Sequence, residues 1–192
     1  LNVMVKKCKK CPDLAKSRKQ SVPGVGAPNA KIIIIGYYPR ISGAEKTGVP
    51  FKGDGSGDFL SRIIKEVGLS LKKDTYLTYL VKCSPRKKGK NVSPKKEHIE
   101  NCISYFIKEI SISTPHIIVS LGLRTSNLIL KHFFSLDKEY EDISKIHMRV
   151  FENPSFKLVP FYSPHDVMVK KAITEDKYIQ DFKSLAKLLK MV

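Results

Sequence analysis

Four cysteines are the residues of this 192-residue chain whose type and spacing most directly suggest chemistry. Cys8 and Cys11 form a C-x2-C pair near the start, and Cys83 and Cys102 follow much later. Four thiolates are the number that a closed metal site requires, and they satisfy either a zinc ion or a cubane iron–sulfur cluster. The spacing alone favours neither metal, and core thiols or disulfides are the alternatives.

The charge of the chain is a second chemical signal. Lys and Arg number 35 against 18 Asp and Glu, which gives a formal net charge of +17, whereas a magnitude of about 2 to 8 keeps a small domain soluble. The basic residues are spread along the chain with Tyr and Phe between them, and no single lysine-rich amphipathic helix stands out. This pattern favours nucleic acid over an anionic membrane as partner. A well-solvated lysine surface, as in proteins adapted to heat, is the alternative.

Length and hydropathy limit the class of protein. With 42% hydrophobic residues, a chain of this length can bury a sizeable core, so we expect one domain over residues 1–192. The longest apolar run, around residues 31–35, is far shorter than the ~20 residues that a membrane span needs. No charged-then-apolar signal segment opens the chain. We therefore expect a cytoplasmic monomer without membrane contact.

The predicted elements alternate between strands and helices. Apolar, β-branched runs predict four strands at residues 31–35, 75–81, 116–121 and 157–162, and apolar residues at helical spacing predict helices near residues 59–67, 93–110, 122–130 and 178–189. Such alternation predicts a mostly parallel sheet wrapped on both faces. The first 30 residues show neither period and are interpreted as loop.

Loops that leave the carboxyl ends of parallel strands line the ligand crevice of such a sheet. Three loops are in this position, at residues 36–40, 82–90 and 163–166. The second of them is rich in Arg and Lys, so it is expected to present positive charge beside the crevice.

Motifs along nearly the whole chain resemble the iron–sulfur branch, family 4, of the uracil-DNA glycosylase superfamily. The matching segments are residues 8–11 (C-x2-C), 22–26 (Val-x-Gly-x-Gly), 48–53 (Gly-x-Pro-Phe-x-Gly), 81–85 (Val-Lys-Cys-x-Pro), 97–102 (Glu-x4-Cys) and 115–122 (Pro-x-Ile-Ile-x-x-Leu-Gly). The resemblance implies a three-layer α/β/α fold around a central four-stranded, mostly parallel sheet. It also implies a prokaryotic base excision repair enzyme that hydrolyses the N-glycosidic bond of uracil, or another deaminated base, flipped out of DNA.

The resemblance also assigns roles to particular residues. It implies that the four cysteines hold a [4Fe–4S] cluster, with residues 1–30 as the cluster-binding segment, and that Phe51 stacks on the flipped base. Single- or double-stranded uracil-containing DNA is the implied partner. The base pocket would include Gly36, Phe51, Tyr79 and Ser163, and the phosphates would be gripped by Arg40, Arg86, Lys87, Lys88 and Lys90.

The sequence departs from the family pattern at its chemical positions. The acidic residue of the first motif is replaced by Tyr37, its neighbouring Ala by Tyr38 and its last Gly by Arg40. The Asn that ends the second strand in relatives, and that reads the pyrimidine edge, corresponds to Tyr79. Relatives have His-Pro after the fourth strand, whereas this chain has Ser163 and Pro164 followed by His165 and Asp166.

Two interpretations follow from these departures. In the first, a rearranged set still cleaves the bond: His165, oriented by Asp166, stabilises the leaving base, and Tyr37, Tyr38 or Tyr79 adds hydroxyl hydrogen bonds. In the second, the fold has lost its chemistry and binds DNA alone, with the tyrosines as stacking platforms. A redox role is a third option. The carboxylates nearest in sequence to the Phe51 loop are Asp54 and Asp58, of which Asp58 is interpreted as a helix cap.

Overall fold

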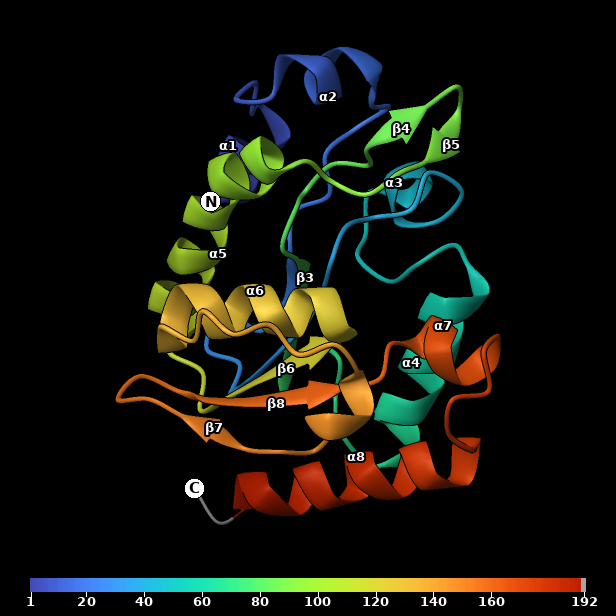
Figure 1. Ribbon diagram of the computed structural model, residues 1–192, viewed down its shortest axis with the longest axis vertical. Helices are drawn as coiled ribbons and strands as arrows, with labels where there is room; N and C mark the ends of the chain where they lie inside the picture. The colour runs from blue at the N-terminus through green and yellow to red at the C-terminus, as the bar shows by residue number, and fades with distance from the viewer. Residues whose placement is uncertain (191–192) are drawn as a thin grey trace.

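A six-stranded sheet forms the centre of the protein in a computed structural model that describes residues 1–190 (Figure 1). Four strands of five residues run parallel in the order β3 (Thr75–Tyr79), β2 (Ile32–Gly36), β6 (Ile117–Leu121) and β8 (Lys157–Phe161). Two-residue antiparallel strands, β1 (Val25–Gly26) and β7 (Phe151–Glu152), close the two edges. The predicted central four-stranded sheet is thus confirmed.

The central strands form because their residues suit a sheet that is covered on both faces. Every residue of β2, β3 and β6 is buried, as expected of parallel strands with near-continuous apolar sequences. β3 ends at Tyr79, two residues earlier than predicted. Beyond it, Leu80 and Val81 still donate backbone hydrogen bonds to the carbonyl oxygens of Gly36 and Tyr37, so the chain stays attached to β2.

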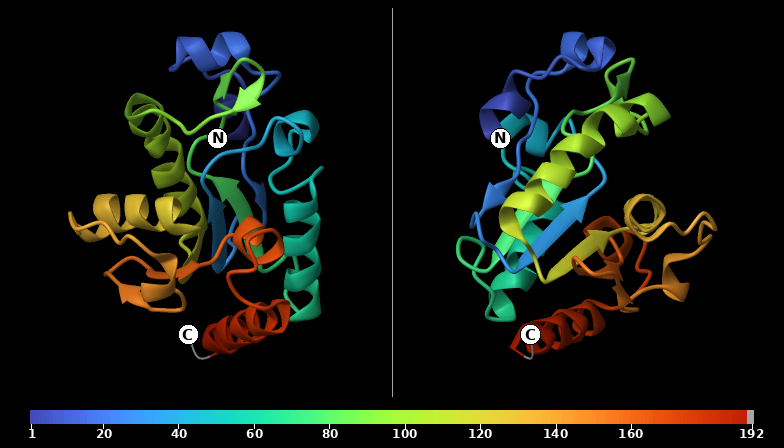
Figure 2. Two further views of the ribbon diagram at one scale, coloured as in Figure 1. Left: turned by 45° about the vertical axis from the view of Figure 1, so that its right-hand side comes forward. Right: turned by 90° about the vertical axis from the view of Figure 1, so that its left-hand side faces the viewer.

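Helices cover both faces of the sheet (Figure 2). On one face lie α5 (Lys96–Ser113) and α6 (Leu123–Phe134), and on the other lie α4 (Gly55–Glu66), α7 (Pro164–Met168) and α8 (Glu175–Lys190). The three-layer α/β/α arrangement and the four long helices agree with the prediction. Within residues 1–190, no helix has the length and apolar content that a membrane crossing requires.

Several short elements lie where loops were predicted. Residues 1–30 contain α1 (Asn2–Lys6) and α2 (Pro12–Ser17) besides β1, and α7 occupies part of the predicted 163–166 loop. One or two helical turns are too short to produce a readable period, although the proline at the first position of α2 is a helix-start signal. Further short elements are α3 (Ala44–Thr47) and the 3-10 helix η1 (Ile143–Lys145).

The predicted 82–90 loop is partly a hairpin of β4 (Arg86–Lys87) and β5 (Lys90–Asn91). Its two connecting residues, Lys88 and Gly89, both have positive φ angles, of 49° and 74°. This is the backbone conformation that a tight hairpin turn requires. The hairpin lies at the same end of the molecule as α1 and α2 (Figure 1).

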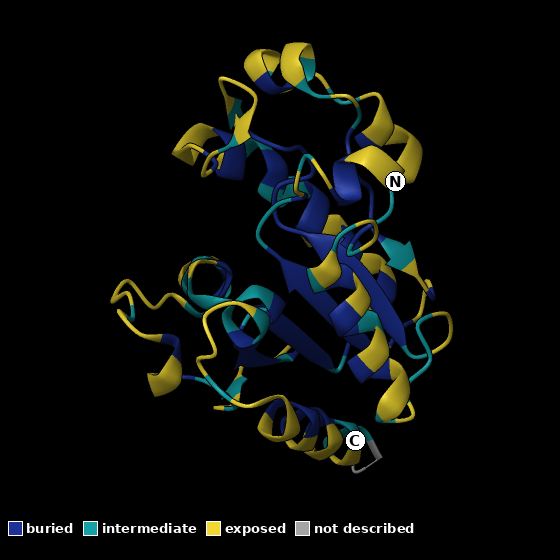
Figure 3. Ribbon diagram, turned by 90° about the vertical axis from the view of Figure 1, so that its right-hand side faces the viewer, coloured by how far each residue is buried: buried dark blue, intermediate teal, exposed yellow. Residues whose placement is uncertain are grey.

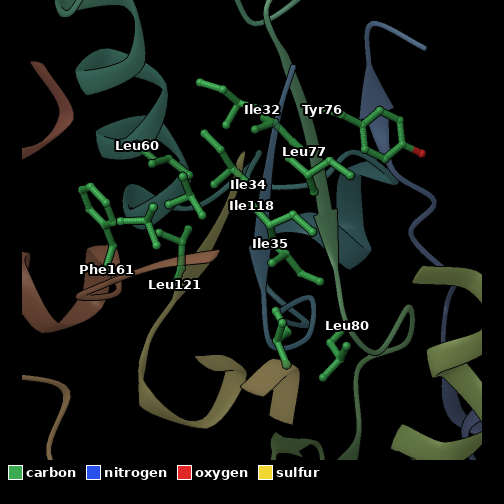
Figure 4. Close-up of a cluster of buried hydrophobic side chains, with 14 of the residues drawn as sticks. Ile32, Ile34, Ile35, Leu60, Tyr76, Leu77, Leu80, Ile118, Leu121 and Phe161 are labelled. Carbon is green, nitrogen blue, oxygen red and sulfur yellow. The ribbon is translucent and has the colours of Figure 1, made fainter. Parts of the chain in front are cut away.

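The hydrophobic core fills the space between the sheet and its helices. Side chains of the strands meet those of α4, and Leu60, Ile34 and Phe161 lie in one such cluster (Figure 4). Ile32 to Ile35 are all fully buried. Exposed residues concentrate on the outward sides of the helices and in the connections (Figure 3). The core therefore fixes the backbone from which the carboxyl-end loops start.

Candidate functional site

The carboxyl ends of the parallel strands bring several predicted site residues together. Tyr37 follows β2, and Ser163 and Asp166 follow β8. These three residues line one crevice, although Tyr37 is more than 120 positions from the other two in the sequence. The same crevice is lined by Gly122, Arg124, Thr125 and Lys170. The structure thus places the first and third predicted loops around a common space.

Phe51 lies against Tyr79 and against Gly36, the residue that precedes Tyr37. Its aromatic ring packs on that of Tyr79, with ring centroids 4.6 Å apart and planes inclined by 36°. A Cβ atom on Gly36 would come within 3.0 Å of both rings, so this position requires glycine. Phe51 itself has φ 52°, a conformation that costs free energy in any residue with a side chain.

Tyr79 is a buried residue whose hydroxyl is already hydrogen-bonded. The backbone N–H of Phe51 donates to Tyr79 Oη at 3.1 Å, and the ring packs with Val22 and Ala44. Burial raises the pKa of the Tyr79 hydroxyl, which therefore stays protonated at neutral pH. The structure thus directs this hydroxyl to Phe51, whereas the sequence analysis expects a base contact.

Tyr37 and Tyr38 occupy the loop in which relatives carry the acidic motif residue. Both are half-buried, and their rings meet edge to face with centroids 5.3 Å apart. Burial raises the pKa of the Tyr37 hydroxyl, and the nearby guanidinium of Arg124 opposes this effect. Arg124 also donates to Ser93 Oγ at 3.1 Å. It therefore connects the loop before α5 to the Tyr37 side of the crevice.

Arg124 is a candidate functional residue that the sequence analysis did not identify. It is exposed in the first turn of α6, directly after β6. The N-cap of α6 is Gly122, which provides no side-chain hydrogen bond, so the first N–H groups of this helix face the crevice end of the sheet. The sequence could have identified Arg124 by its position. A basic residue just beyond the third predicted strand lies at the same carboxyl edge of the sheet as the three predicted loops.

His165 and Asp166 lie in the first turn of α7. Ser163 caps this helix: its Oγ accepts from the N–H of Asp166 at 3.2 Å and donates to Asp166 Oδ2 at 2.6 Å. The other carboxylate oxygen of Asp166 pairs with Lys170 Nζ at 2.7 Å. Among the described residues no hydrogen bond joins Asp166 to the half-buried His165. Asp166 therefore organises the start of α7, and an orienting effect on His165 stays a prediction.

The carboxylates near Phe51 have structural roles at the start of α4. Asp54 is the N-cap, and its Oδ1 accepts from the N–H of Gly57 at 2.9 Å. Asp58 lies one turn later, exposed within the helix. The interpretation of Asp58 as the cap is wrong, because the helix begins at Gly55, one residue after Asp54.

The predicted phosphate-binding residues fall into two groups. Arg86 pairs with the buried carboxylate of Glu45 in α3, which fastens the β4–β5 hairpin to that helix and occupies the guanidinium. Lys87, Lys88 and Lys90, called here the hairpin lysines, are exposed, as is Arg40. The exposed residues can reach a polyanion, whereas Arg86 holds in place the hairpin that carries the hairpin lysines.

The four cysteines gather around one small cavity between the amino-terminal segment and α5. Cys8 and Cys11 lie in the short connection between α1 and α2, Cys83 follows β3, and Cys102 lies in α5. All four are free thiols, so the disulfide alternative does not hold for this structure. Three segments distant in the sequence thus converge on one thiol site.

Hydrogen-bond donors surround these sulfur atoms. Arg18 Nη1 donates to Cys83 Sγ at 2.9 Å, the backbone N–H of Lys82 to Cys102 Sγ at 3.3 Å, and Asn101 Nδ2 to Cys11 Sγ at 3.5 Å. Burial raises the pKa of Cys102 to about 12 and also raises the pKa of Cys83. Without a cation these thiols would be neutral, so a metal centre would supply the charge that makes them ligands.

A second group of potential ligands lies next to the cysteines. Within residues 1–190, Asp13, Glu97 and His98 have ligand atoms that all lie within 4.8 Å of one another, and no cysteine sulfur belongs to this group. His98 Nε2 is 3.0 Å from Asp13 Oδ2, and His98 Nδ1 accepts from the N–H of Lys95. The buried imidazole thereby joins α2 to the start of α5.

Comparisons with known proteins agree with this arrangement. A family model described as the uracil DNA glycosylase superfamily matches residues 23–186. A type-4 uracil-DNA glycosylase of Archaeoglobus fulgidus is 31% identical over 94% of this chain and 87% of its own length. One from Saccharolobus solfataricus is 33% identical over 90% and 79%. A type-5 uracil-DNA glycosylase of Thermus thermophilus is 30% identical over 66% and 68%.

Proposed function

Because the chain belongs to the uracil DNA glycosylase superfamily, we propose that it hydrolyses the N-glycosidic bond of uracil, or another deaminated base, in DNA during base excision repair. The observation that supports this proposal is the crevice at the carboxyl edge of the sheet. Tyr37 and Ser163 both line it, and the aromatic side chain of Phe51 lies against Gly36, the residue that precedes Tyr37. A base reaches such a crevice only after its nucleotide is rotated out of the helix.

The reaction joins a water oxygen to the sugar C1′ and breaks the bond from C1′ to the base nitrogen. The base departs with the bonding electrons, and one proton of the water is released. Because the sugar carbon becomes cationic and the base anionic, hydrogen-bond donors around the base lower the barrier. His165, Tyr37 and Tyr38 are the donors that we assign to this task. Electrostatic stabilisation and positioning compensate for the missing motif carboxylate.

The four cysteines are proposed to hold a [4Fe–4S] cluster. The positions of their sulfur atoms support a cluster over zinc: four thiolates on a zinc ion at 2.3 Å would lie only about 3.8 Å apart. Within residues 1–190, no three of the cysteines have sulfur atoms that all lie within 4.8 Å of one another. The N–H donors on Cys11, Cys83 and Cys102 suit sulfur atoms that carry negative charge. The cluster would supply a covalent link between residues 1–30 and the sheet.

DNA is the substrate, and we assign its phosphate contacts to the hairpin lysines and Arg40. Two observations support this assignment. All four side chains are exposed, and within residues 1–190 no ion pair involves the hairpin lysines. The surplus of positive charge would attract the polyanion from every direction. A monomeric enzyme has the crevice and the hairpin on the same chain, so we expect no partner subunit to be needed.

The proposal is tested by single-turnover cleavage. Oligonucleotides that carry uracil, hypoxanthine or xanthine, single- and double-stranded, are incubated with excess protein and treated with alkali to reveal abasic sites. We expect cleavage of at least one base by the wild type and a sharp loss for His165→Ala. DNA affinity should remain nearly unchanged. His132→Ala, at an exposed histidine in α6, is the matched control.

A DNA-binding protein without glycosylase activity is the second candidate. Two observations favour it. Tyr37 replaces the motif carboxylate, and the ring of Tyr79 packs on the ring of Phe51. If the wild type binds DNA and cleaves none of the bases, this candidate replaces the first. Equal cleavage by His165→Ala and the wild type would keep the enzyme and remove His165 from its mechanism.

A further inference from the structure

Tyr79 makes the same kinds of contact with Phe51 that a flipped base would make. Its ring packs on Phe51 with centroids 4.6 Å apart and planes inclined by 36°, a close aromatic contact. Its hydroxyl oxygen accepts from the N–H of Phe51 at 3.1 Å, as a base carbonyl could. We propose that Tyr79 is a built-in occupant of the base-binding site, which a flipped base must displace from Phe51. This inference rests on the proposed stacking role of Phe51.

The space around Phe51 does not hold Tyr79 and a base together. Tyr79 is only 6% exposed, and Val22 and Ala44 pack against it. A single carbon added at Gly36 would already come within 3.0 Å of both rings. A base that stacks on this side of Phe51 therefore takes the volume of the phenol ring.

The backbone of Tyr79 can stay in place while its ring moves. Tyr79 is the last residue of β3 and pairs with Gly36 of β2, and the following residues remain hydrogen-bonded to the β2 side. Rotation about the Cα–Cβ bond is thus the motion that would clear Phe51. Side chains change rotamer without any change in the strand, so the sheet need not open.

The displacement has a chemical consequence for base selection. When the Tyr79 hydroxyl leaves, the N–H of Phe51 loses its acceptor, and a buried N–H without a partner is unfavourable. A base that presents a carbonyl oxygen replaces the lost hydrogen bond. A base that presents an exocyclic amine does not, because the amine is a donor. Deamination converts such amines into carbonyls. The exchange therefore favours deaminated bases, although this chain lacks the Asn that relatives have at the Tyr79 position.

Variants at Tyr79 test the proposal. Tyr79→Ala removes the ring without adding a polar group, whereas Tyr79→Phe removes only the hydroxyl. Tyr76→Phe is the matched control, because Tyr76 is a largely buried tyrosine of the same strand whose hydroxyl contacts Glu109 instead of Phe51. The measurements are single-turnover cleavage of uracil DNA and the dissociation constant for an oligonucleotide with non-cleavable 2′-fluoro-2′-deoxyuridine. An oligonucleotide of the same sequence with 2′-deoxycytidine at this position provides the reference affinity, because cytosine presents an exocyclic amine.

We expect Tyr79→Ala to prefer the fluorouridine oligonucleotide over its deoxycytidine reference about tenfold more than the wild type does, because the ring contact and the hydrogen bond of Tyr79 no longer oppose entry of the base. Its cleavage should also accelerate. Tyr79→Phe should show a smaller gain of about threefold, since the N–H of Phe51 then has no internal acceptor. Tyr76→Phe should match the wild type.

The opposite result identifies Tyr79 as a support for Phe51. If folded Tyr79→Ala shows the same preference as the wild type or a weaker one, the proposal is overturned. Should Tyr79→Ala fail to fold, Tyr79→Phe decides, and an unchanged preference refutes the proposal. Failure of the proposed function is a different outcome: the wild type and every variant then leave all bases uncleaved, and the fluorouridine preference still decides whether Tyr79 occupies the site.

Discussion

The buried ion pair between Lys82 and Glu109 leads to a quantitative prediction. Lys82 Nζ lies 2.8 Å from Glu109 Oε1 and 2.7 Å from Oε2, and each side chain is only 1% exposed. Glu109 also accepts from the hydroxyl of Thr78 at 3.0 Å. The pair joins the end of β3 to α5, so its two charges compensate each other between the sheet and a covering helix.

Replacing Lys82 by Met removes the cation and leaves the carboxylate of Glu109 buried with hydroxyl donors alone. Breaking a buried pair in this way costs about 3–5 kcal/mol. For a domain of this length, that loss corresponds to a decrease in Tm of roughly 6–20 °C. The double variant Lys82→Met/Glu109→Gln should recover most of the loss, because no uncompensated charge remains.

Urea denaturation of the protein loaded with its iron–sulfur cluster, followed by circular dichroism, measures these free energies of unfolding. Lys96→Met is the control, because Lys96 forms an exposed ion pair with Glu100 in the same helix and should cost at most about 0.5 kcal/mol. A loss below about 1 kcal/mol for Lys82→Met would refute the reasoning. So would a double variant that is no more stable than the single one.

Three further predictions concern the cluster, the DNA contact and the acid stability. Cys102→Ser should abolish visible absorbance and bound iron and lower Tm, and retention of the full iron content would remove Cys102 from the site. Alanine at all three hairpin lysines should reduce the slope of log K against log salt by up to about 2.7 on duplex DNA, and an unchanged slope would contradict their phosphate contacts. Burial opposes ionisation of Asp166, but hydrogen bonds from Lys170 and Ser163 prevail and lower its pKa. Its ionised form should therefore stabilise the fold above about pH 4 and lose that effect as pH falls through the lowered pKa, so urea titrations of Asp166→Asn should converge with the wild type in acid.

The main layers could be predicted because their signals are local. The four apolar runs identify the central strands, since β-branched residues without polar alternation suit strands that are buried on both faces. By contrast, α1, α2 and α7 span at most six residues, which is too short for a periodic pattern. The cysteine motifs predict one metal site, and in the structure all four cysteines line the same cavity.

The side-chain partners at the site could not be predicted because they depend on residues distant in the sequence. Arg86 is basic and lies in a loop, as a phosphate contact would, but Glu45 is buried within its reach. The position of Tyr79 follows from its motif. The direction of its ring depends on Phe51, 28 residues earlier. Arg124 has no motif of its own, and only the parallel sheet brings it beside Tyr37.

The attachment of the first 30 residues has a consequence for the order of events during synthesis. Three side chains of this segment contact residues much later in the sequence. Arg18 contacts Cys83, 65 positions later, Asp13 contacts His98, 85 positions later, and Lys10 contacts Ser104, 94 positions later. At about 5–20 residues per second, the ribosome delivers these partners roughly 3–19 s after the segment itself. Residues 1–30 are thus synthesised before the partners that hold them, so the C-x2-C pair of Cys8 and Cys11 stays exposed to oxidants and competing metals until α5 has been made.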